Sequence, residues 1–210
     1  MKDELLQLFP EIGLIGNASL QKNVIDTYIA TLEQGNWKVK ELCEIPFTLD
    51  FPEFIFSYAD HVHGVTQISA EAAKAFNRTY ASNKKYQVNV DLTIAGALLH
   101  DVGKLLEYER SENGYFRKTA YGRALRHPVS GAILAHACGC PKELCHIIAV
   151  HAAEGDCSIR SPEAIIVNKA DFINFDIINS LRQHLKRQKN LLNYGTKSPV
   201  RSCTELGFCI

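Results

Sequence analysis

The sequence contains no apolar run of about 18 residues, the length that a membrane-spanning helix needs. Its first residues, MKDELLQLFPEIG, also lack the basic start and apolar centre of a secretory signal peptide. Both absences argue against the transmembrane and secreted classes. We therefore expect a cytoplasmic protein that does not enter a membrane.

An excess of either charge is also missing, because 23 Lys and Arg residues balance 23 Asp and Glu residues. The chain therefore has no overall positive field that would attract nucleic acid or a lipid surface. One local exception is a basic run near the C-terminus, formed by Arg182, Lys186, Arg187, Lys189, Lys197 and Arg201. Such a run usually forms a solvated face, and contact with nucleic acid is the alternative.

The cysteines give no sign of a disulfide framework. There are seven, an odd number, and free thiols are the usual state in a cytoplasmic chain. A structural zinc site is the alternative for the group Cys138, Cys140, Cys145 and Cys157. Their spacing does not match two paired C-x2-C knuckles, so we expect small buried thiols there.

What the sequence does contain fits a single helical domain with additions. Its 210 residues, 46% of them hydrophobic and 22% charged, suffice for one domain with a sizeable core. We expect three parts: a helical N-terminal extension at residues 1–52 that packs on the core, the main domain at 53–190, and a tail at 191–210.

Helical periodicity accounts for most of the chain. Residues 19–33 carry an apolar stripe that Asn17 or Ser19 can start and Gly35 can end. We expect further long helices over residues 54–80 and 163–189.

Three local signals refine this prediction. Asp91 is a suitable cap for a helix that continues through His100 and Asp101 to about residue 107. Asn113-Gly114 between short polar and aromatic runs predicts a two-stranded hairpin. His127-Pro128 predicts another helix start, with proline in the first turn and His127 at the cap.

The main chemical signal is a histidine and an aspartate at the end of an apolar run. IAGALL at residues 94–99 leads directly into His100 and Asp101. Imidazole and carboxylate are both good metal ligands, and a charge in so apolar a stretch is unfavourable unless it is paired or bound. Adjacent residues on a helix point about 100° apart, so both can hold one ion. The alternative is a helix end at which Asp101 pairs with Lys104.

Other histidines lie in similar surroundings, at His61, His127 and His151. His61 shares an apolar helical stripe with Val65, Ile68 and Ala72 and is expected to face inward. His63 points away from that stripe, and we expect it to support a ligand or lie on the surface.

A second aspartate, Asp171, lies inside the apolar run IIVNKADFI and therefore needs a partner. An ion pair with Lys169 is one solution and a metal is the other. Together, His61, His100, Asp101 and Asp171 come from three expected helices and can enclose one ion with open coordination positions.

Five spaced segments of this chain resemble the HD-domain superfamily of metal-dependent phosphohydrolases. They are DHVHGVTQIS (60–69), ALLHDVGK (97–104), RHPVSGAIL (126–134), IIAVHAAEGD (147–156) and NKADFINF (168–175). The layout looks most like the HD domain of the ribonuclease Y group. The RNA-binding module and membrane anchor of that group are missing from this sequence, so its RNA substrate is not carried over.

The resemblance implies an all-α HD-domain bundle around a metal site, with His127 and His151 adding a second ion and Asp101 bridging the two. Two divalent ions are the implied cofactor, and Fe, Mn, Mg, Ni and Zn are not distinguished. Two such ions can share a hydroxide that attacks a phosphate. Asp101 and Lys104 are the expected catalytic residues. Lys104 would also hold a substrate anion, with Arg123 and Arg126 as weaker candidates for phosphate recognition.

These features favour a metal-dependent phosphohydrolase or phosphodiesterase that cleaves a phosphate ester of a small soluble substrate, such as a nucleotide or cyclic phosphate. The same ligands also resemble those of mixed-valent di-iron oxygenases of the HD fold, which is the first alternative. A non-catalytic HD module that senses a ligand is the second alternative. Departures from the subfamilies narrow the choice. The chain lacks the Gly-Tyr-Pro signature of the cyclic-di-GMP-degrading branch, and it has His151-Ala152 where many phosphodiesterases of the superfamily have paired histidines. The small nucleoside-monophosphatase branch has a glutamate near the position of Lys104 and lacks the two extra histidines.

Overall fold

The computed structural model describes residues 1–51, 53 and 55–195, with side chains to residue 189. The chain divides into two units, Met1–Asn174 and Phe175–Ile210, and each is described by itself. The described part of the second unit is the C-terminal stretch of one helix, α9. Lys197 and Arg201 of the predicted basic run lie outside the described residues, as does most of the predicted tail. The expected boundaries of the three parts stay predictions.

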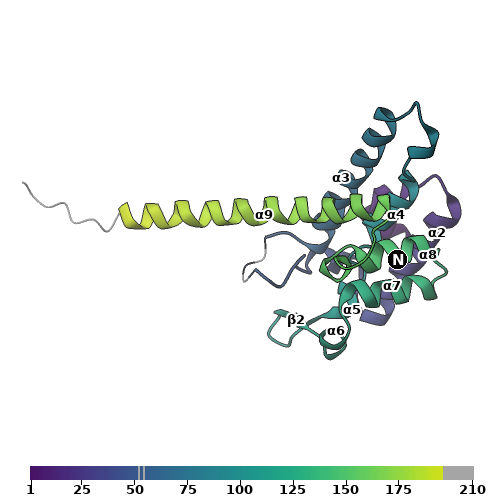
Figure 1. The fold of residues 1–210 in the computed structure, drawn as a ribbon. Helices are drawn as coiled ribbons and strands as arrows, with labels where there is room; N and C mark the ends of the chain where they lie inside the picture. The colour runs from purple at the N-terminus through teal and green to yellow at the C-terminus, as the bar shows by residue number, and fades with distance from the viewer. Residues whose placement is uncertain (52, 54, 196–210) are drawn as a thin grey trace, which may run out of the picture. The chain divides into compact units, whose positions relative to one another are not determined.

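Helices dominate the described residues (Figure 1). In chain order the α-helices are α1 (Lys2–Leu8), α2 (Ala18–Gly35), α3 (Tyr58–Thr79), α4 (Val90–Leu99), α5 (Lys104–Glu107), α6 (Ala120–Ala124), α7 (His127–Ala137), α8 (Lys142–Val150) and α9 (Pro162–Gly195). The 3-10 helices are η1 (Pro10–Leu14), η2 (Val39–Cys43), η3 (Lys84–Tyr86) and η4 (Ala153–Gly155). The strands are β1 (Tyr108–Arg110) and β2 (Phe116–Lys118). The predicted all-α class with a small hairpin is confirmed.

The N-terminal helices share a core with the later ones. Leu5 of α1, Tyr28 of α2, Leu98 of α4 and Leu144 of α8 are fully buried in one hydrophobic cluster. Burial of such side chains is the main favourable contribution to folding. A second cluster joins α3, α4, α8 and the start of α9, and so fixes the first turns of α9 against the domain.

The hairpin is present as predicted. β1 and β2 pair antiparallel with Tyr108 opposite Lys118 and Arg110 opposite Phe116. Gly114 in the connecting turn has a φ of 80°, a value that L side chains rarely adopt, which explains a glycine there.

Several predicted helix ends are wrong by a few residues. α3 begins at Tyr58 and not at residue 54, because Ser57 and Asp60 form a reciprocal capping box. Asn89, and not Asp91, caps α4 by accepting a hydrogen bond from Leu92 N at 3.0 Å. The other side chain, Asp91, accepts a hydrogen bond from Asn17 N at 2.8 Å. The helix starts therefore follow side-chain capping, which the apolar pattern alone does not specify.

Later ends differ as well. The stripe predicted on α3 drifts, so that Ala72 is exposed and Ala73 is buried. The cap of α7 is Arg126, and His127 is the first residue of that helix. α9 starts at Pro162 and continues to Gly195, beyond the predicted end at residue 189.

The most consequential difference is a break in the helix that was expected to continue to residue 107. α4 ends at Leu99, and α5 starts only at Lys104. The intervening turn is tighter than an α-helix: Val102 N donates to Leu99 O at 3.0 Å, three residues back. Tyr28 donates its hydroxyl to the Leu98 carbonyl at 2.5 Å and so satisfies an acceptor at the broken helix end.

Replacing Tyr28 by phenylalanine is expected to destabilise the fold by about 1–3 kcal/mol, because the buried Leu98 carbonyl loses its donor. Urea unfolding monitored by circular dichroism measures this change. Tyr86→Phe is the control, since Tyr86 is 66% exposed. Equal unfolding midpoints for both variants would show that the hydroxyl does not support the break.

The part of the chain that the structure describes contains no helix that is both long and apolar enough to span a membrane.

Candidate metal centre

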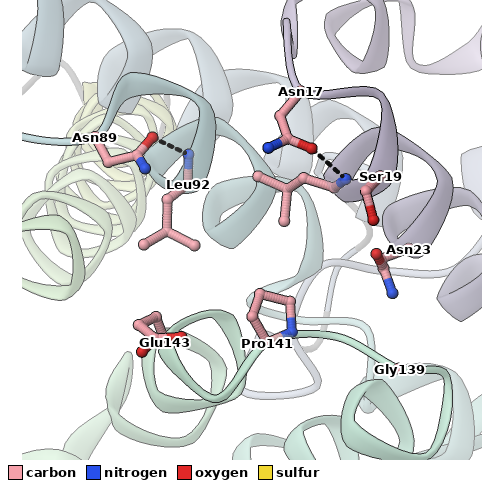
Figure 2. Close-up of a pocket in the computed structure, with 9 residues that line it drawn as sticks. Asn17, Ser19, Asn23, Asn89, Leu92, Gly139, Pro141 and Glu143 are labelled. Atoms are coloured by element: carbon pink, nitrogen blue, oxygen red, sulfur yellow. Dashed lines mark hydrogen bonds between the residues drawn. The ribbon is translucent and has the colours of Figure 1, made fainter.

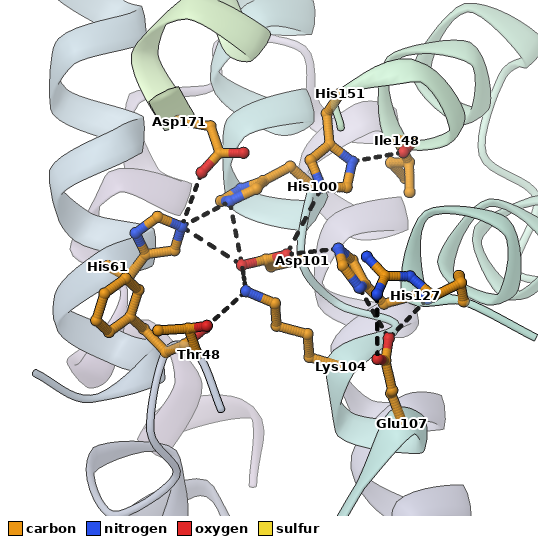
Figure 3. A network of polar contacts seen from close by, with 12 residues as sticks. Thr48, His61, His100, Asp101, Lys104, Glu107, His127, Ile148, His151 and Asp171 are labelled. Atoms are coloured by element: carbon orange, nitrogen blue, oxygen red, sulfur yellow. Dashed lines mark hydrogen bonds and ion pairs between the residues drawn. The ribbon is translucent and has the colours of Figure 1, made fainter. Parts of the chain in front are cut away.

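The six side chains predicted as metal ligands come from separate elements and converge in one place (Figure 3). They are His61 on α3, His100 and Asp101 in the turn after α4, His127 at the start of α7, His151 directly after α8, and Asp171 on α9. Five of them are buried, and the side chain of Asp171 is 18% exposed.

Asp101 lies between two groups of donor atoms. Its Oδ2 is 3.4 Å from the Nε2 atoms of His61 and His100. Its Oδ1 is 3.2 Å from His127 Nε2 and 3.6 Å from His151 Nε2. Each group, with its Asp101 oxygen, is compact enough to hold one ion. Asp171 Oδ1 adds a fourth donor beside the first group, 3.1 Å from His61 Nε2.

The tautomers of the four histidines are set by acceptors on the far side of each ring. His100 Nδ1 lies 2.6 Å from Ala97 O, and His151 Nδ1 lies 2.7 Å from Ile148 O. These acceptors are backbone carbonyls, so both nitrogens must donate. His61 Nδ1 donates to Asn174 Oδ1 at 2.8 Å, and His127 Nδ1 donates to Glu107 Oε2 at 2.8 Å. Each of the four rings, when neutral, therefore directs the lone pair of Nε2 inward.

This arrangement fits a bound cation. His61 Nε2 and His100 Nε2 face each other at 3.3 Å, and both also face the Asp101 carboxylate. Lone pairs at such distances repel unless a positive charge lies among them. Imidazole and carboxylate donors suit Zn, Fe, Mn and related divalent ions, so the fit does not select one metal.

Without an ion, protons supply that positive charge. Burial acts to lower the pKa of His61, but hydrogen bonds with Asp101 and Asp171 outweigh it and raise that pKa to about 9. For His127, burial dominates and lowers the pKa to about 4, despite the bond to Glu107. In the metal-free protein at neutral pH, His61 is therefore charged and His127 is neutral.

Ion affinity at the first group is accordingly expected to rise with pH. An ion must displace the proton of His61, so apparent affinity should increase up to ~tenfold per pH unit below about 9. Calorimetry with Mn²⁺ at pH 6.5, 7.5 and 8.5 in buffers of different ionisation enthalpy measures both affinity and the protons released. His63→Gln, whose ring pairs with Glu11 at 2.9 Å, is the control and should keep this dependence. A pH-independent affinity would contradict the assignment of a proton to His61.

Lys104 lies directly against the Asp101 carboxylate. Its Nζ is 2.6 Å from Asp101 Oδ2 and donates to the backbone carbonyl of Phe47 at 2.6 Å. Burial acts to lower the pKa of Lys104, but the charge of Asp101 raises it above its usual value, so the ammonium stays charged. The pair Asp101–Lys104, which the sequence offered as an alternative to metal binding, exists together with the two histidine groups.

The two arginines named from the sequence lie at the surface. Arg126 Nε donates to Glu154 Oε1 at 3.0 Å, and Arg123 Nη1 donates to the carbonyl of Lys118 at 2.6 Å. Their part in substrate binding stays a prediction.

Two other expectations concern the neighbours of the site. The sequence offered Lys169 as one partner for Asp171. Lys169 is exposed, and Asp171 lies against His61. The five cysteines among the described residues are free, and none belongs to a group that could hold a metal.

Sequence reasoning missed the residues that hold the candidate ligands in place. Asn174 supports His61, and Glu107 supports His127. Asn168 donates to the carbonyl of His151 at 2.6 Å. Signals existed for two of them: Asn174 lies one turn after Asp171, and Glu107 interrupts the apolar run LLEY as Asp171 interrupts its own run.

A separate pocket of about 450 Å³ lies between the starts of α2, α4 and α8 (Figure 2). Asn17 and Asn89 line it, and each side chain already accepts a hydrogen bond from its own helix, from Leu20 N and Leu92 N. These polar groups therefore serve as helix caps, and nothing about them indicates a ligand.

Comparison with protein families agrees with the geometry. The family described as HD domain matches residues 58–175, more than half of the chain and all six candidate ligands. Comparisons with curated proteins and with solved structures find no match. Because the family match and the converging His and Asp side chains cover the same segment, this chain belongs to the HD-domain superfamily, whose members are generally metal-dependent phosphohydrolases.

Proposed function

We propose that this protein is a metal-dependent phosphohydrolase or phosphodiesterase that cleaves a phosphate ester of a small soluble substrate, such as a nucleotide or a cyclic phosphate. The observation that carries the proposal is the position of Asp101, one oxygen of which faces each histidine group. A carboxylate shared in this way is suited to two ions. Two divalent ions would supply Lewis acidity that neutralises negative charge on a phosphate.

The chain's own residues would divide the remaining work. Asp101, His61, His100 and Asp171 form one ligand set, and Asp101, His127 and His151 form the other. Three or four protein donors leave coordination positions open for a substrate oxygen.

Lys104 is suited to the phosphate itself. An ammonium has three N–H donors, and two of them meet Asp101 and Phe47. The third can donate to a phosphate oxygen next to the bridging carboxylate. Because these two contacts already fix the lysine side chain, binding a phosphate would cost little further side-chain entropy.

Metal content and a substrate screen test the proposal. The protein is purified without added metal, analysed for elements, and assayed with p-nitrophenyl phosphate, bis(p-nitrophenyl) phosphate and 2′,3′- and 3′,5′-cyclic nucleotides. Hydrolysis that chelation abolishes and added Mn²⁺ restores is expected. Full activity of the metal-free protein would overturn the proposal.

The same experiment separates the alternatives. About two irons per chain, a mixed-valent EPR signal on partial oxidation and no phosphate release would favour the oxygenase. Nucleotide binding by a protein that takes up no metal would favour the sensing module.

A further inference from the structure

Glu107 is a buried carboxylate that belongs to neither ligand group. Its side chain is only 1% exposed, although it is the last residue of the short helix α5. Burying a carboxylate is unfavourable unless several donors compensate it, so its contacts are informative.

Both oxygens of Glu107 are engaged, and one of them serves His127 twice. Oε2 accepts hydrogen bonds from His127 N at 2.9 Å and from His127 Nδ1 at 2.8 Å. Oε1 forms an ion pair with Lys118 Nζ on β2 at 2.5 Å and lies 4.0 Å from Arg126 Nη1, a more distant cation. One carboxylate thus caps the first turn of α7, orients its histidine ring and connects both to the hairpin.

The backbone around Glu107 is also constrained. A Cβ added at Gly122 of α6 would lie 2.5 Å from Glu107 Cα and 2.6 Å from its Cγ. Thr119 N donates to the Glu107 carbonyl at 2.8 Å. The carboxylate therefore has little freedom to move away from His127.

This support distinguishes the two ligand groups. The Nδ1 atoms of His61, His100 and His151 donate to neutral acceptors, an amide or backbone carbonyls. Among the four Nδ1 atoms, only that of His127 donates to a carboxylate. A charged acceptor makes the opposite ring nitrogen a stronger metal ligand. The group with fewer protein donors thus contains the histidine with the charged acceptor. This group consists of Asp101, His127 and His151.

We propose that Glu107 and Lys118 form an electrostatic pair that sets the affinity of the second ion position. Glu107 strengthens His127 as a ligand, and Lys118 weakens that effect by sharing the carboxylate. The two residues therefore act in opposite directions on one ion and leave the other ion unchanged. This inference rests on the metal centre proposed above and names Glu107 as a positioning residue.

The test is a titration of the metal-free protein with Co²⁺, followed by calorimetry and by the cobalt absorption spectrum. Wild type is expected to bind two ions of different affinity. Glu107→Gln should raise the Kd of one ion by about 10–100-fold and leave the other within about twofold. Lys118→Met, a substitution at a partly exposed side chain, should lower the same Kd by about two- to threefold, because a positive charge near the ion is removed.

Because the two variants are expected to change the Kd in opposite directions, the test separates an electrostatic effect on the ion from structural support. If the carboxylate only held the fold together, loss of either partner would weaken ion binding. Glu109→Gln is the matched control, since Glu109 forms an exposed pair with Arg117 in the same hairpin, and both affinities should stay as in wild type.

Three outcomes would overturn the inference: unchanged affinities in Glu107→Gln, weaker binding in Lys118→Met, or fewer than two ions in wild type. If Glu107→Gln does not fold, the direction of the Lys118→Met effect decides alone. Phosphate release is assayed separately, so two tuned ions without hydrolysis would overturn the proposed function and leave this inference supported.

Discussion

Asp101→Asn is expected to abolish binding of both ions and all phosphate release. The substitution keeps the shape of the side chain but removes the negative charge that faces four Nε2 atoms. It also leaves Lys104 as a buried cation without its counter-charge, which costs about 3–5 kcal/mol of stability. Elemental analysis, the phosphate assay and urea unfolding measure the three effects, and far-UV circular dichroism should still show a helical fold at 25 °C.

A double variant separates metal loss from destabilisation. Asp101→Asn with Lys104→Met removes both charges of the buried pair and is expected to regain stability without regaining metal. Asp26→Asn, at an exposed carboxylate on α2 that pairs with Lys22, is the control for a simple loss of charge. Retention of two ions by Asp101→Asn would disprove the bridging role.

Gly103→Ala is expected to destabilise the protein by about 1–3 kcal/mol or more and to disturb the second ion position. Gly103 has a φ of −64°, so its backbone conformation accepts alanine, and the effect is steric. An added Cβ would meet the carbonyl oxygen of His127, and would lie 2.7 Å from Ser130 Oγ and 2.8 Å from Gly131 N. Two of these atoms are backbone of α7, which can move only if the helix moves and takes the His127 ring with it.

Gly13→Ala is the matched control for Gly103→Ala. A Cβ at Gly13 meets nothing within 4 Å, so this variant should unfold at the wild-type urea concentration and bind both ions. Comparison of Co²⁺ stoichiometry and unfolding midpoints gives both readouts. If Gly103→Ala behaves like Gly13→Ala, the turn and α7 do not pack as closely as the structure indicates.

The convergence of the candidate ligands is the part that the sequence anticipated most directly. Asp171 was predicted because a carboxylate in an apolar run requires a partner, and the structure places it against His61. His61 was predicted to face inward from helical spacing, and it is buried. These inferences rest on local pattern and on the energy of burying charge, both of which can be read along the chain. Their role as ligands stays a prediction until metal is measured.

The helix ends were less accessible to sequence reasoning. Asp91 and Asn89 are both good helix caps. Asn89 caps α4 in the structure, while Asp91 contacts Asn17, 74 positions away. A long-range contact of this kind leaves no trace in the local periodicity. For the same reason the break after Leu99 was missed, since the hydroxyl that satisfies the Leu98 carbonyl comes from Tyr28 on α2.

The sequence by itself therefore determined the helical class and the hairpin at Gly114, because periodicity and turn chemistry are local properties. It also pointed to the side chains able to bind metal, some through buried charge and His127 and His151 through the resemblance to a family. Only the tertiary structure decided how Asp101 presents one oxygen to each histidine group, and that Glu107 rather than solvent faces His127. Those features depend on distances between α3, α5, α7 and α8. Packing sets these distances to a few tenths of an ångström, and spacing along the chain does not encode them.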